Sequence, residues 1–374
     1  MESVFEKRIA SLQTLIAKSD LDLVAIIAGP SQIYFSGLHF HLSERPAVLL
    51  VSADQEPAFI FPEFETDKVV HTPIHLAAFP YHESHADWVN TFSRAINRFN
   101  AGNLLIGVEP TAMRYLEMDL LGYHYDHIRF TSAAAMVETL RASKDEEEIS
   151  HIRAAIRIAQ TALKKTLPAI KAGVSEKEIA NQLVINLLRE GSDPELPFFP
   201  IVASGPNSAN PHAVPGDRLL CEGDLLIIDW GARYQGYISD ITRTFAIGSV
   251  SPQLEEVYRV VKTANQTARD LHSTEFTGKM IDDAARSVIT DAGYGEAFLH
   301  RTGHGFGLEA HEPPYISAEN SGFIPQGAAF TIEPGIYLRG VGGVRIEDDM
   351  RLLGQELETL TTLDRELIRL QGGS

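Results

Sequence analysis

The sequence of 374 residues predicts an α+β protein with two domains, a smaller α/β domain over residues 1–140 and a larger domain over residues 141–374. Before residue 130, short apolar runs alternate with amphipathic stretches. A polar, charged segment, RASKDEEE, then begins at Arg141 and indicates a boundary. After it, the order of two helices followed by strands occurs twice, which indicates two similar halves whose sheets could pack around one site.

The first domain is expected to combine helices with a mixed sheet. Residues 1–20 have helical periodicity and early acidic residues, so they indicate a first helix and not a signal peptide. An amphipathic stretch at 85–99 predicts another helix. Four apolar runs rich in Val, Leu and Ile predict strands, at residues 21–28, 46–53, 58–62 and 103–109. No glycine-rich phosphate loop follows these runs, which argues against nucleotide binding.

The second domain begins with two helices that carry capping signals. Ser143 with Glu146 predicts one capping box, and Ser175 with Glu178 predicts the next. Gly191 is expected to end the second helix. Apolar residues follow the first box at helical spacing, at Ile149, Ile152, Ile156, Leu163 and Leu167.

The same order then repeats. Ser251 and Pro252 predict the N-cap and first position of a third helix. A fourth helix is expected over about 278–292, with Gly293 as its stop. Strand-rich sequence follows each pair of helices, at 224–248 after a proline-rich turn region (193–216), and at 299–354.

Composition excludes several functional classes. The formal net charge is -18 with no basic tail or stripe, so neither nucleic acid nor a membrane surface is expected as a partner. No stretch approaches the ~18 apolar residues that a membrane span needs. Cys221 is the one cysteine, which excludes an internal disulfide, and we expect it to be a small buried side chain. These features predict a cytoplasmic protein.

The segment LLIIDWGARYQGYISDITRTF (225–245) contains the first pair of acids. Two strand-like runs flank a polar turn that ends at Gly236. If the loop is Tyr234–Gln235, Asp229 and Asp240 face each other across a hairpin, with Cβ atoms about 5 Å apart. A loop that is one residue longer shifts this register by one residue.

The segment FTIEPGIYLRGVGGVRIEDDMRLL (330–353) contains a second pair. Glu333 and Glu347 are symmetric about Gly340, which lies in a glycine-rich turn. A simple hairpin with a three-residue loop therefore places these two carboxylates opposite each other as well.

Two opposed acidic pairs among apolar residues are costly without a counter-charge. Like charges that face each other destabilise a sheet, and partial burial adds to that cost. The pairs must therefore share protons or bind cations. If the four carboxylates meet at one site, two divalent ions balance their charge.

The segment HRTGHGFGLEAHEPP (300–314) adds three histidines at offsets of four and seven, among glycines that let the backbone pass close to a ligand. One imidazole with four carboxylates suits manganese, cobalt, iron or zinc better than calcium. With metal ions about 3.5–4 Å apart, a bridging water loses its proton near neutral pH and becomes a nucleophile.

Over about residues 141–360 these motifs resemble the creatinase, prolidase and aminopeptidase P family, the pita-bread metallopeptidases related to methionine aminopeptidase. The resemblance implies a pita-bread catalytic domain that binds two divalent ions, manganese being the first expectation and cobalt, zinc or iron the alternatives. It also implies the roles of the ligands. Asp229 holds one ion, His304 and Glu333 hold the other, and Asp240 and Glu347 bridge both.

The resemblance assigns roles to further residues. His212 in ANPHAVPGD, His300, and His311 in HEPP match positions that contact substrate or stabilise the tetrahedral intermediate. Arg345 matches an arginine that orients the carboxylates. Glu333 also matches the proton shuttle between the bridging water and the leaving nitrogen.

The first 140 residues resemble the extra α/β domain of the prolidase and aminopeptidase P branch, which argues against a methionine aminopeptidase. The resemblance implies a homodimer in which this domain helps to close the partner's active site. It also implies an exopeptidase that cleaves the bond between an N-terminal residue and proline, in dipeptides or short peptides.

Substrate length and the alternatives to a peptidase stay open. Some prolidases have an arginine four residues after the second substrate histidine, where this chain has Tyr315. This departure weakens the case for strict dipeptide use, unless Arg45 or Arg339 replaces that cation. The alternatives are a metal-free creatinase-like amidinohydrolase, a non-catalytic binding protein, or a metal hydrolase of another amide or ester bond. The presence of all five ligands argues against the first two.

Overall fold

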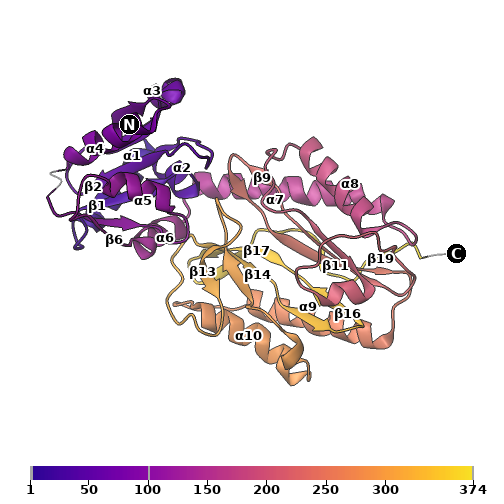
Figure 1. Cartoon of the computed structure of the whole chain (residues 1–374). Helices are drawn as coiled ribbons and strands as arrows, with labels where there is room; N and C mark the ends of the chain where they lie inside the picture. The colour runs from indigo at the N-terminus through magenta and orange to yellow at the C-terminus, as the bar shows by residue number, and fades with distance from the viewer. Residues whose placement is uncertain (1–2, 100–101, 373–374) are drawn as a thin grey trace. The chain divides into compact units, whose positions relative to one another are not determined.

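A computed structural model describes residues 3–99 and 102–372 of the chain. Residues 1–2 of the predicted first helix and residues 373–374 of the predicted second domain lie outside the described part. The chain divides into two compact units, Met1–Arg141 and Ala142–Ser374 (Figure 1). The first is an α/β unit and the second combines helix pairs with largely antiparallel sheets, so the predicted α+β class is confirmed.

The first unit contains a six-stranded mixed sheet with the order β4-β3-β2-β1-β5-β6. Its strands are β1 (Leu23–Ile27), β2 (Val48–Ser52), β3 (Ala58–Pro62), β4 (Ala77–Tyr81), β5 (Leu105–Val108) and β6 (Arg129–Ser132). Its helices are α1 (Val4–Ile16), α2 (Pro30–Ser36), α3 (Thr66–Val70), α4 (His85–Asn97), α5 (Tyr115–Gly122) and α6 (Ala134–Ala142), with a 3-10 turn η1 (Glu63–Glu65). The four predicted strands are β1, β2, β3 and β5. The edge strands β4 and β6 were not predicted, because β4 (AAFPY) contains a proline and is partly exposed, and β6 (RFTS) is largely polar.

Four long helices form two pairs in the second unit. They are α7 (Glu146–Thr166), α8 (Glu176–Arg189), α9 (Pro252–Arg269) and α10 (Gly278–Asp291), with 3-10 turns η2 (Leu167–Ala169), η3 (Gly205–Ala209) and η4 (Gly295–Ala297). The capping box of Ser175 with Glu178 is present, and Ser251 caps α9 with Pro252 behind it. Beyond the end of α10, Gly293 has the left-handed φ of 84°. These local predictions are confirmed.

The capping box predicted at Ser143 and Glu146 is wrong. The carboxylate of Asp145 accepts the backbone N–H of Glu148, and the Glu148 side chain accepts the N–H of Asp145. The capping box that opens α7 is therefore formed two residues further on, by Asp145 in place of a serine and by Glu148. Ser143 instead donates its hydroxyl hydrogen to the carbonyl of Gln326 at 2.7 Å.

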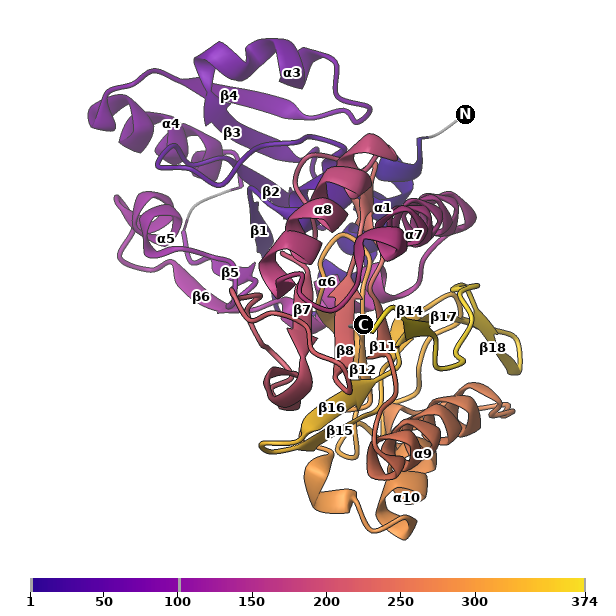
Figure 2. The same ribbon diagram turned by 90° about the vertical axis from the view of Figure 1, so that its right-hand side faces the viewer.

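The strands of the second unit lie between the helix pair α7 and α8 and the helix pair α9 and α10 (Figures 1 and 2). Their sheets have the orders β19-β11-β8-β7, β13-β12-β14-β17-β18, β10-β9 and β15-β16. The strands of the first half are β7 (Ile201–Ser204), β8 (Leu225–Trp230), β9 (Arg233–Tyr234), β10 (Tyr237–Ile238) and β11 (Ile241–Ile247). Those of the second half are β12 (Gly303–Gly305), β13 (Glu312–Ile316), β14 (Ala329–Ile332), β15 (Gly335–Leu338), β16 (Gly342–Arg345), β17 (Asp348–Leu353), β18 (Glu356–Thr359) and β19 (Arg369–Leu370). Only β7 falls in the region that was predicted as proline-rich turns.

The register predicted for the first hairpin is wrong by two residues. Tyr234 pairs with Tyr237, so the loop is Gln235–Gly236 and Asp240 does not lie directly opposite Asp229. Both loop residues have positive φ, 51° and 83°, as in a type I′ turn, and such a turn favours a glycine inside the loop. Because side chains alternate along a strand with a period of two, a shift of two residues keeps Asp229 and Asp240 on the same face.

The register predicted for the second hairpin is confirmed. β14 pairs with β17, and β15 pairs with β16, in one continuous register around a three-residue loop at 339–341. Glu333 and Glu347 lie in the short gaps between these strands, at opposed positions.

The two hairpins meet at Thr242 and Glu347. The Thr242 carbonyl accepts the backbone N–H of Glu347 at 3.1 Å, and the Thr242 hydroxyl donates to the Glu347 carboxylate at 2.6 Å. The buried amide of Asn265 in α9 donates to the carbonyls of Ile332 and Ile346 at 3.2 and 3.3 Å. These bonds attach a helix and both hairpins to one another where the acidic residues lie.

Within the described residues, no helix is long and apolar enough to cross a membrane. Cys221 is exposed, so the expectation that it is buried is wrong. It lies before β8 and not within that buried strand.

Gly231 lies where the two strands of the first hairpin approach closely. A Cβ atom at Gly231 would be 2.1 Å from the carbonyl oxygen of Ser239 and 2.8 Å from Pro197 Cγ. We therefore expect Gly231→Ala to lower the free energy of unfolding by about 1–3 kcal/mol, measured by denaturant unfolding. Gly216→Ala is the control and should be nearly neutral, because its Cβ would meet nothing closer than 3.8 Å. Equal midpoints for the two variants would contradict the close approach.

Candidate metal centre and active site

All the side chains predicted for the site line one cavity of about 680 Å³ in the second unit. The predicted metal ligands among them are Asp229, Asp240, His304, Glu333 and Glu347, and the others are His212, His300, His311 and Arg345. Apolar side chains, including Phe198, Phe199 and Ile201, line the same cavity. The structure therefore brings residues from both halves of the second unit together and leaves none of the predicted site residues elsewhere.

Strands and strand ends of two sheets carry the five ligand candidates. Asp229 lies in β8 and Asp240 directly precedes β11. His304 lies in β12, Glu333 follows β14, and Glu347 lies between β16 and β17. Four of these residues are buried, and Glu333 is slightly exposed, with 14% of its side chain accessible. Because strand pairing fixes the backbone near each ligand, the side chains need little ordering to converge.

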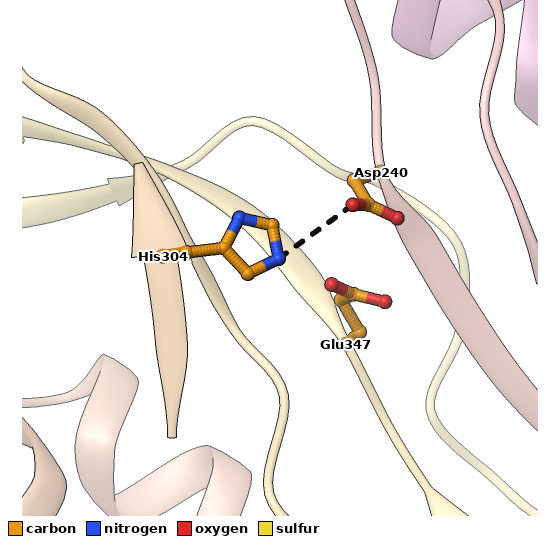
Figure 3. A group of neighbouring side chains, drawn as sticks. All are labelled: Asp240, His304 and Glu347. Carbon is orange, nitrogen blue, oxygen red and sulfur yellow. Dashed lines mark ion pairs between the residues drawn. The ribbon is translucent and has the colours of Figure 1, made fainter. Parts of the chain in front are cut away.

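Asp240, His304 and Glu347 point toward one another (Figure 3). One ligand atom from each lies within 4.8 Å of the others, and His304 Nε2 is 3.7 Å from an oxygen of Asp240. His304 Nδ1 is 3.1 Å from the carbonyl oxygen of Gly305. If Nε2 of His304 binds a cation, Nδ1 carries the proton and donates to that carbonyl, and the lone pair of Nε2 is directed toward the carboxylates.

Asp229 and Glu333 lie beside these three residues. Glu333 Oε1 is 3.2 Å from His304 Nε2. Asp229 Oδ2 accepts a hydrogen bond from Arg345 at 2.6 Å, whereas Asp229 Oδ1 is buried and has no hydrogen-bond partner among the residues described. A buried acceptor without a partner raises the free energy of the folded state, so this oxygen indicates a bound cation.

Burial and mutual repulsion shift the pKa values of the acidic side chains in the cavity. Burial raises the pKa of Asp240 and Glu347 well above the ordinary carboxyl value, and neighbouring carboxylates raise it further. Burial also raises the pKa of Asp229, against the opposing effect of a nearby guanidinium. Burial acts to raise the pKa of Glu333, but the hydrogen bond and charge of His304 outweigh it and lower that pKa to about 2. Cations would favour the ionised form of all four carboxylates.

The donor set fits divalent metal ions. Four carboxylates and one imidazole form an oxygen-rich set of borderline softness, which suits manganese, cobalt, iron or zinc. The unpartnered oxygen of Asp229 and the repulsion between Asp240 and Glu347 both call for positive charge in the cavity. The Asp229 oxygen and the repulsion between the two carboxylates favour a bound cation whichever substrate the protein takes.

Arg345 connects the acids to a buried hydrogen-bond network. Besides Asp229, its guanidinium donates to the hydroxyls of Thr242 at 3.1 Å and Tyr337 at 2.9 Å. The Tyr337 hydroxyl in turn lies 2.8 Å from Nε2 of His300, whose Nδ1 lies 2.7 Å from a backbone carbonyl. Burial lowers the pKa of His300, so the imidazole is neutral, accepting from Tyr337 through Nε2.

His311 and His212 occupy different settings in the cavity. The ring centroids of His311 and His304 are 4.2 Å apart. Burial, helped by the charge of His304, lowers the pKa of His311 to about 4, so this imidazole is neutral at pH 7 and can donate a hydrogen bond. His212 is exposed, and its backbone N–H donates to the side chain of Asn210 at 3.1 Å.

Sequence reasoning missed three residues that hold the site together, Thr242, Tyr337 and Asp349. The Asp349 carboxylate accepts the backbone N–H of Asp240 at 3.2 Å. Thr242 could have been found, because it lies two residues after Asp240 on the same strand face. The sequence does not single out Tyr337 and Asp349 in this way, since their distance along the chain from the ligand candidates is that of ordinary strand residues.

The chain was compared with known proteins. Residues 150–352 match metallopeptidase family M24, and residues 8–143 match the creatinase/prolidase N-terminal domain. The chain is 37% identical to a dipeptidase from Pyrococcus horikoshii OT3, with a TM-score of 0.91 over 97% of this chain and 100% of that chain. It is 32% identical to an Xaa-Pro dipeptidase from Bacillus anthracis, with a TM-score of 0.89 over 98% and 100%. It is 33% identical to an X-Pro aminopeptidase from Thermotoga maritima MSB8, with a TM-score of 0.84 over 97% and 99%.

The family match covers more than half of the chain, and the solved structures match along nearly their whole length. The similarity confirms the resemblance to the pita-bread peptidases and the expectation of a metal-dependent hydrolase. It also agrees with peptides as the class of substrate and with the use of divalent metal. The chain belongs to metallopeptidase family M24 and has a creatinase/prolidase N-terminal domain before its M24 region.

Proposed function

We propose that the protein is a dinuclear-metal exopeptidase that hydrolyses the bond between an N-terminal residue and a following proline. The observation that carries this proposal is the convergence of five metal-binding side chains on a cavity that also has an apolar wall. Two of the similar structures are, by name, an Xaa-Pro dipeptidase and an X-Pro aminopeptidase, which supports proline as the second residue.

The proposed ligand roles follow the resemblance. Asp229 would hold one ion, His304 and Glu333 would hold the other, and Asp240 and Glu347 would be shared by both. Manganese is the first candidate, with cobalt, zinc or iron as alternatives. Divalent ions held by these residues would supply Lewis-acid activation of a water molecule and of the peptide carbonyl.

The protein's own groups move protons and orient the substrate. Glu333 accepts a proton from the attacking water and passes it to the leaving nitrogen of proline. His311 and His212 donate hydrogen bonds to the substrate. His300 orders the network through Tyr337, and Arg345 fixes the orientation of Asp229.

The apolar wall suits a proline ring. Phe198, Phe199 and Ile201 line the cavity together with Pro197 and Pro211. A tertiary amide carries no N–H, so the residue after the scissile bond needs no hydrogen-bond acceptor at that point, and its ring gains from apolar burial.

We also propose that the enzyme is a cytoplasmic homodimer. Residues 141–374 form the catalytic domain in this proposal. Residues 1–140 contribute to the dimer and help to close the active site of the partner. The similarity of this part to the creatinase/prolidase N-terminal domain supports the proposal.

Asp240→Asn tests the metal assignment. Loss of one charge from a bridging ligand should lower metal content from about two ions per chain and reduce turnover by at least about 100-fold. Elemental analysis and a peptidase assay on the same preparation measure both effects. The matched control is Asp217→Asn, whose side chain is 95% exposed, and it should change neither quantity. Normal turnover with two bound ions in Asp240→Asn would show that the assignment is wrong.

Peptide hydrolysis tests the reaction. With manganese present, the enzyme should cleave Ala-Pro faster than Ala-Ala, because the cavity offers the proline ring an apolar wall. A chelator should abolish the activity, and added manganese should restore it. Failure to cleave any Xaa-Pro or Xaa-Pro-Xaa peptide in the presence of manganese would rule the proposed function out.

A further inference from the structure

The segment between β7 and β8 brings His212 to the cavity. This segment, residues 204–216, is called the His212 loop below; it begins at the end of β7 and contains the 3-10 turn η3. Figure 2 shows α8 beside β7, the strand that leads into the loop. The side chain of His212 is exposed, although it lines the cavity. Its position therefore depends on the backbone of the loop more than on packing around the imidazole.

The carboxylate of Glu176, in the first turn of α8, joins the two ends of the His212 loop. Its Oε1 accepts the backbone N–H and the hydroxyl hydrogen of Ser204, both at 2.8 Å. Its Oε2 accepts the backbone N–H of Gly216 at 3.2 Å. The side-chain amide of Asn207 donates to both oxygens at 3.2 Å. Glu176 is fully buried, so these bonds form away from water.

The start of α8 supports the same base of the loop. The backbone N–H of Glu176 donates to the carbonyl of Arg218 at 3.1 Å, and that of Lys177 donates to the carbonyl of Gly216 at 3.0 Å. The Arg218 guanidinium donates to the Ser204 hydroxyl at 2.5 Å, so this hydroxyl accepts from Arg218 while it donates to Glu176. The free N–H groups of the helix end and one carboxylate thus close the loop at its base.

The middle of the His212 loop is attached to the second hairpin. The backbone N–H of Gly343 in β16 donates to the Ser208 hydroxyl at 2.8 Å. A Cβ atom at Gly343 would be 2.2 Å from the Ser208 carbonyl oxygen, so glycine permits this close approach. The guanidinium of Arg345 donates to the carbonyl of Pro211, the residue before His212, at 3.3 Å. The loop is therefore held at its base by α8 and near its tip by β16.

We propose that Glu176 is a positioning residue, which closes the His212 loop at its base and thereby holds His212 where it contacts the substrate. This inference rests on the proposed function, because that function includes the contact between His212 and substrate. A loop with closed ends has fewer conformations, so less entropy is lost when His212 binds the substrate. A displacement of about 1 Å in such a group can lower turnover by about 100-fold.

A carboxylate suits this position better than an amide of the same shape. Every recorded partner of the Glu176 side chain among the described residues is a hydrogen-bond donor, and an ionised carboxylate is an acceptor only. In Glu176→Gln the new NH₂ group would face these donors and leave a buried N–H without an acceptor.

Glu178 provides a matched control in the same turn of α8. It is exposed and forms the capping box with Ser175. A glutamine can form the same box, so Glu178→Gln removes one charge from this turn and leaves the His212 loop closed.

The test measures kcat and KM for Ala-Pro on the manganese-loaded, full-length enzyme. Glu176→Gln should lower kcat/KM by about 10-fold without loss of bound metal, and Glu178→Gln should leave it within about twofold of the wild type. His212→Ala should lower kcat/KM at least as much as Glu176→Gln. The double variant should be no worse than His212→Ala alone, because no imidazole is left to position. Amide hydrogen exchange over residues 204–216 should be faster in Glu176→Gln than in Glu178→Gln.

The outcomes separate this inference from the proposed function. If the wild-type enzyme cleaves Ala-Pro and Glu176→Gln cleaves it equally well, the positioning role is overturned and the peptidase proposal stands. Independent, multiplying effects in the double variant, or loss of metal in Glu176→Gln alone, would show that Glu176 supports the fold in general and would also overturn the role. A wild-type enzyme that cleaves no Xaa-Pro peptide would overturn both proposals.

Asn207→Ala carries the test if Glu176→Gln does not fold. Asn207 is exposed, and its amide is the donor that joins the two oxygens of Glu176. Its loss should lower kcat/KM by about two- to fivefold, and this effect should disappear in the His212→Ala background. An equal effect in both backgrounds would overturn the positioning role.

Discussion

Asp229, Asp240, Glu333 and Glu347 lie around one cavity, and the rest of the second unit depends on how their mutual repulsion is offset. A buried carboxylate is costly in itself, and it becomes more costly beside another negative charge. Among the residues that the structure describes, a directly bonded guanidinium is present for only one of them, through Arg345 and Asp229. Such a cluster needs further positive charge, and divalent metal ions supply it, in agreement with membership of metallopeptidase family M24.

The hydrogen bonds around these acids fix their geometry more than they stabilise the fold. Thr242 bonds to Glu347 through both backbone and side chain, and Asp349 accepts the backbone N–H of Asp240. Asn265 ties α9 to the same hairpin. Buried charged and polar networks of this kind add little net stability, but they hold each ligand in one orientation, which a metal site requires. The cost of the site is thereby offset by the apolar packing of the two helix pairs around the strands.

The same cavity also contains apolar and positively charged side chains. Aromatic and aliphatic side chains line part of it, and Arg301 contributes a guanidinium stacked on Tyr315. An acidic cluster suited to divalent cations and an apolar wall together match the proposed substrate, which has a peptide carbonyl and a proline ring. In the proposed function the metal centre performs the reaction, while the apolar wall determines which peptides it accepts.

Most of the helices, the strands with continuous apolar runs and the donor set of the metal site were determined by the sequence, because caps, periodicity and residue chemistry are local. The register around the loop 339–341 was also predictable, since a symmetric turn leaves one way to pair its strands. The loop 235–236 was misplaced by one position, because a type I′ turn takes its glycine inside the loop, and the register moved by two residues. Only the tertiary structure decided which side chains bond across the cavity. Arg345 and Asp229 are 116 residues apart, and their contact depends on how two separate hairpins pack, which no local signal in the chain specifies.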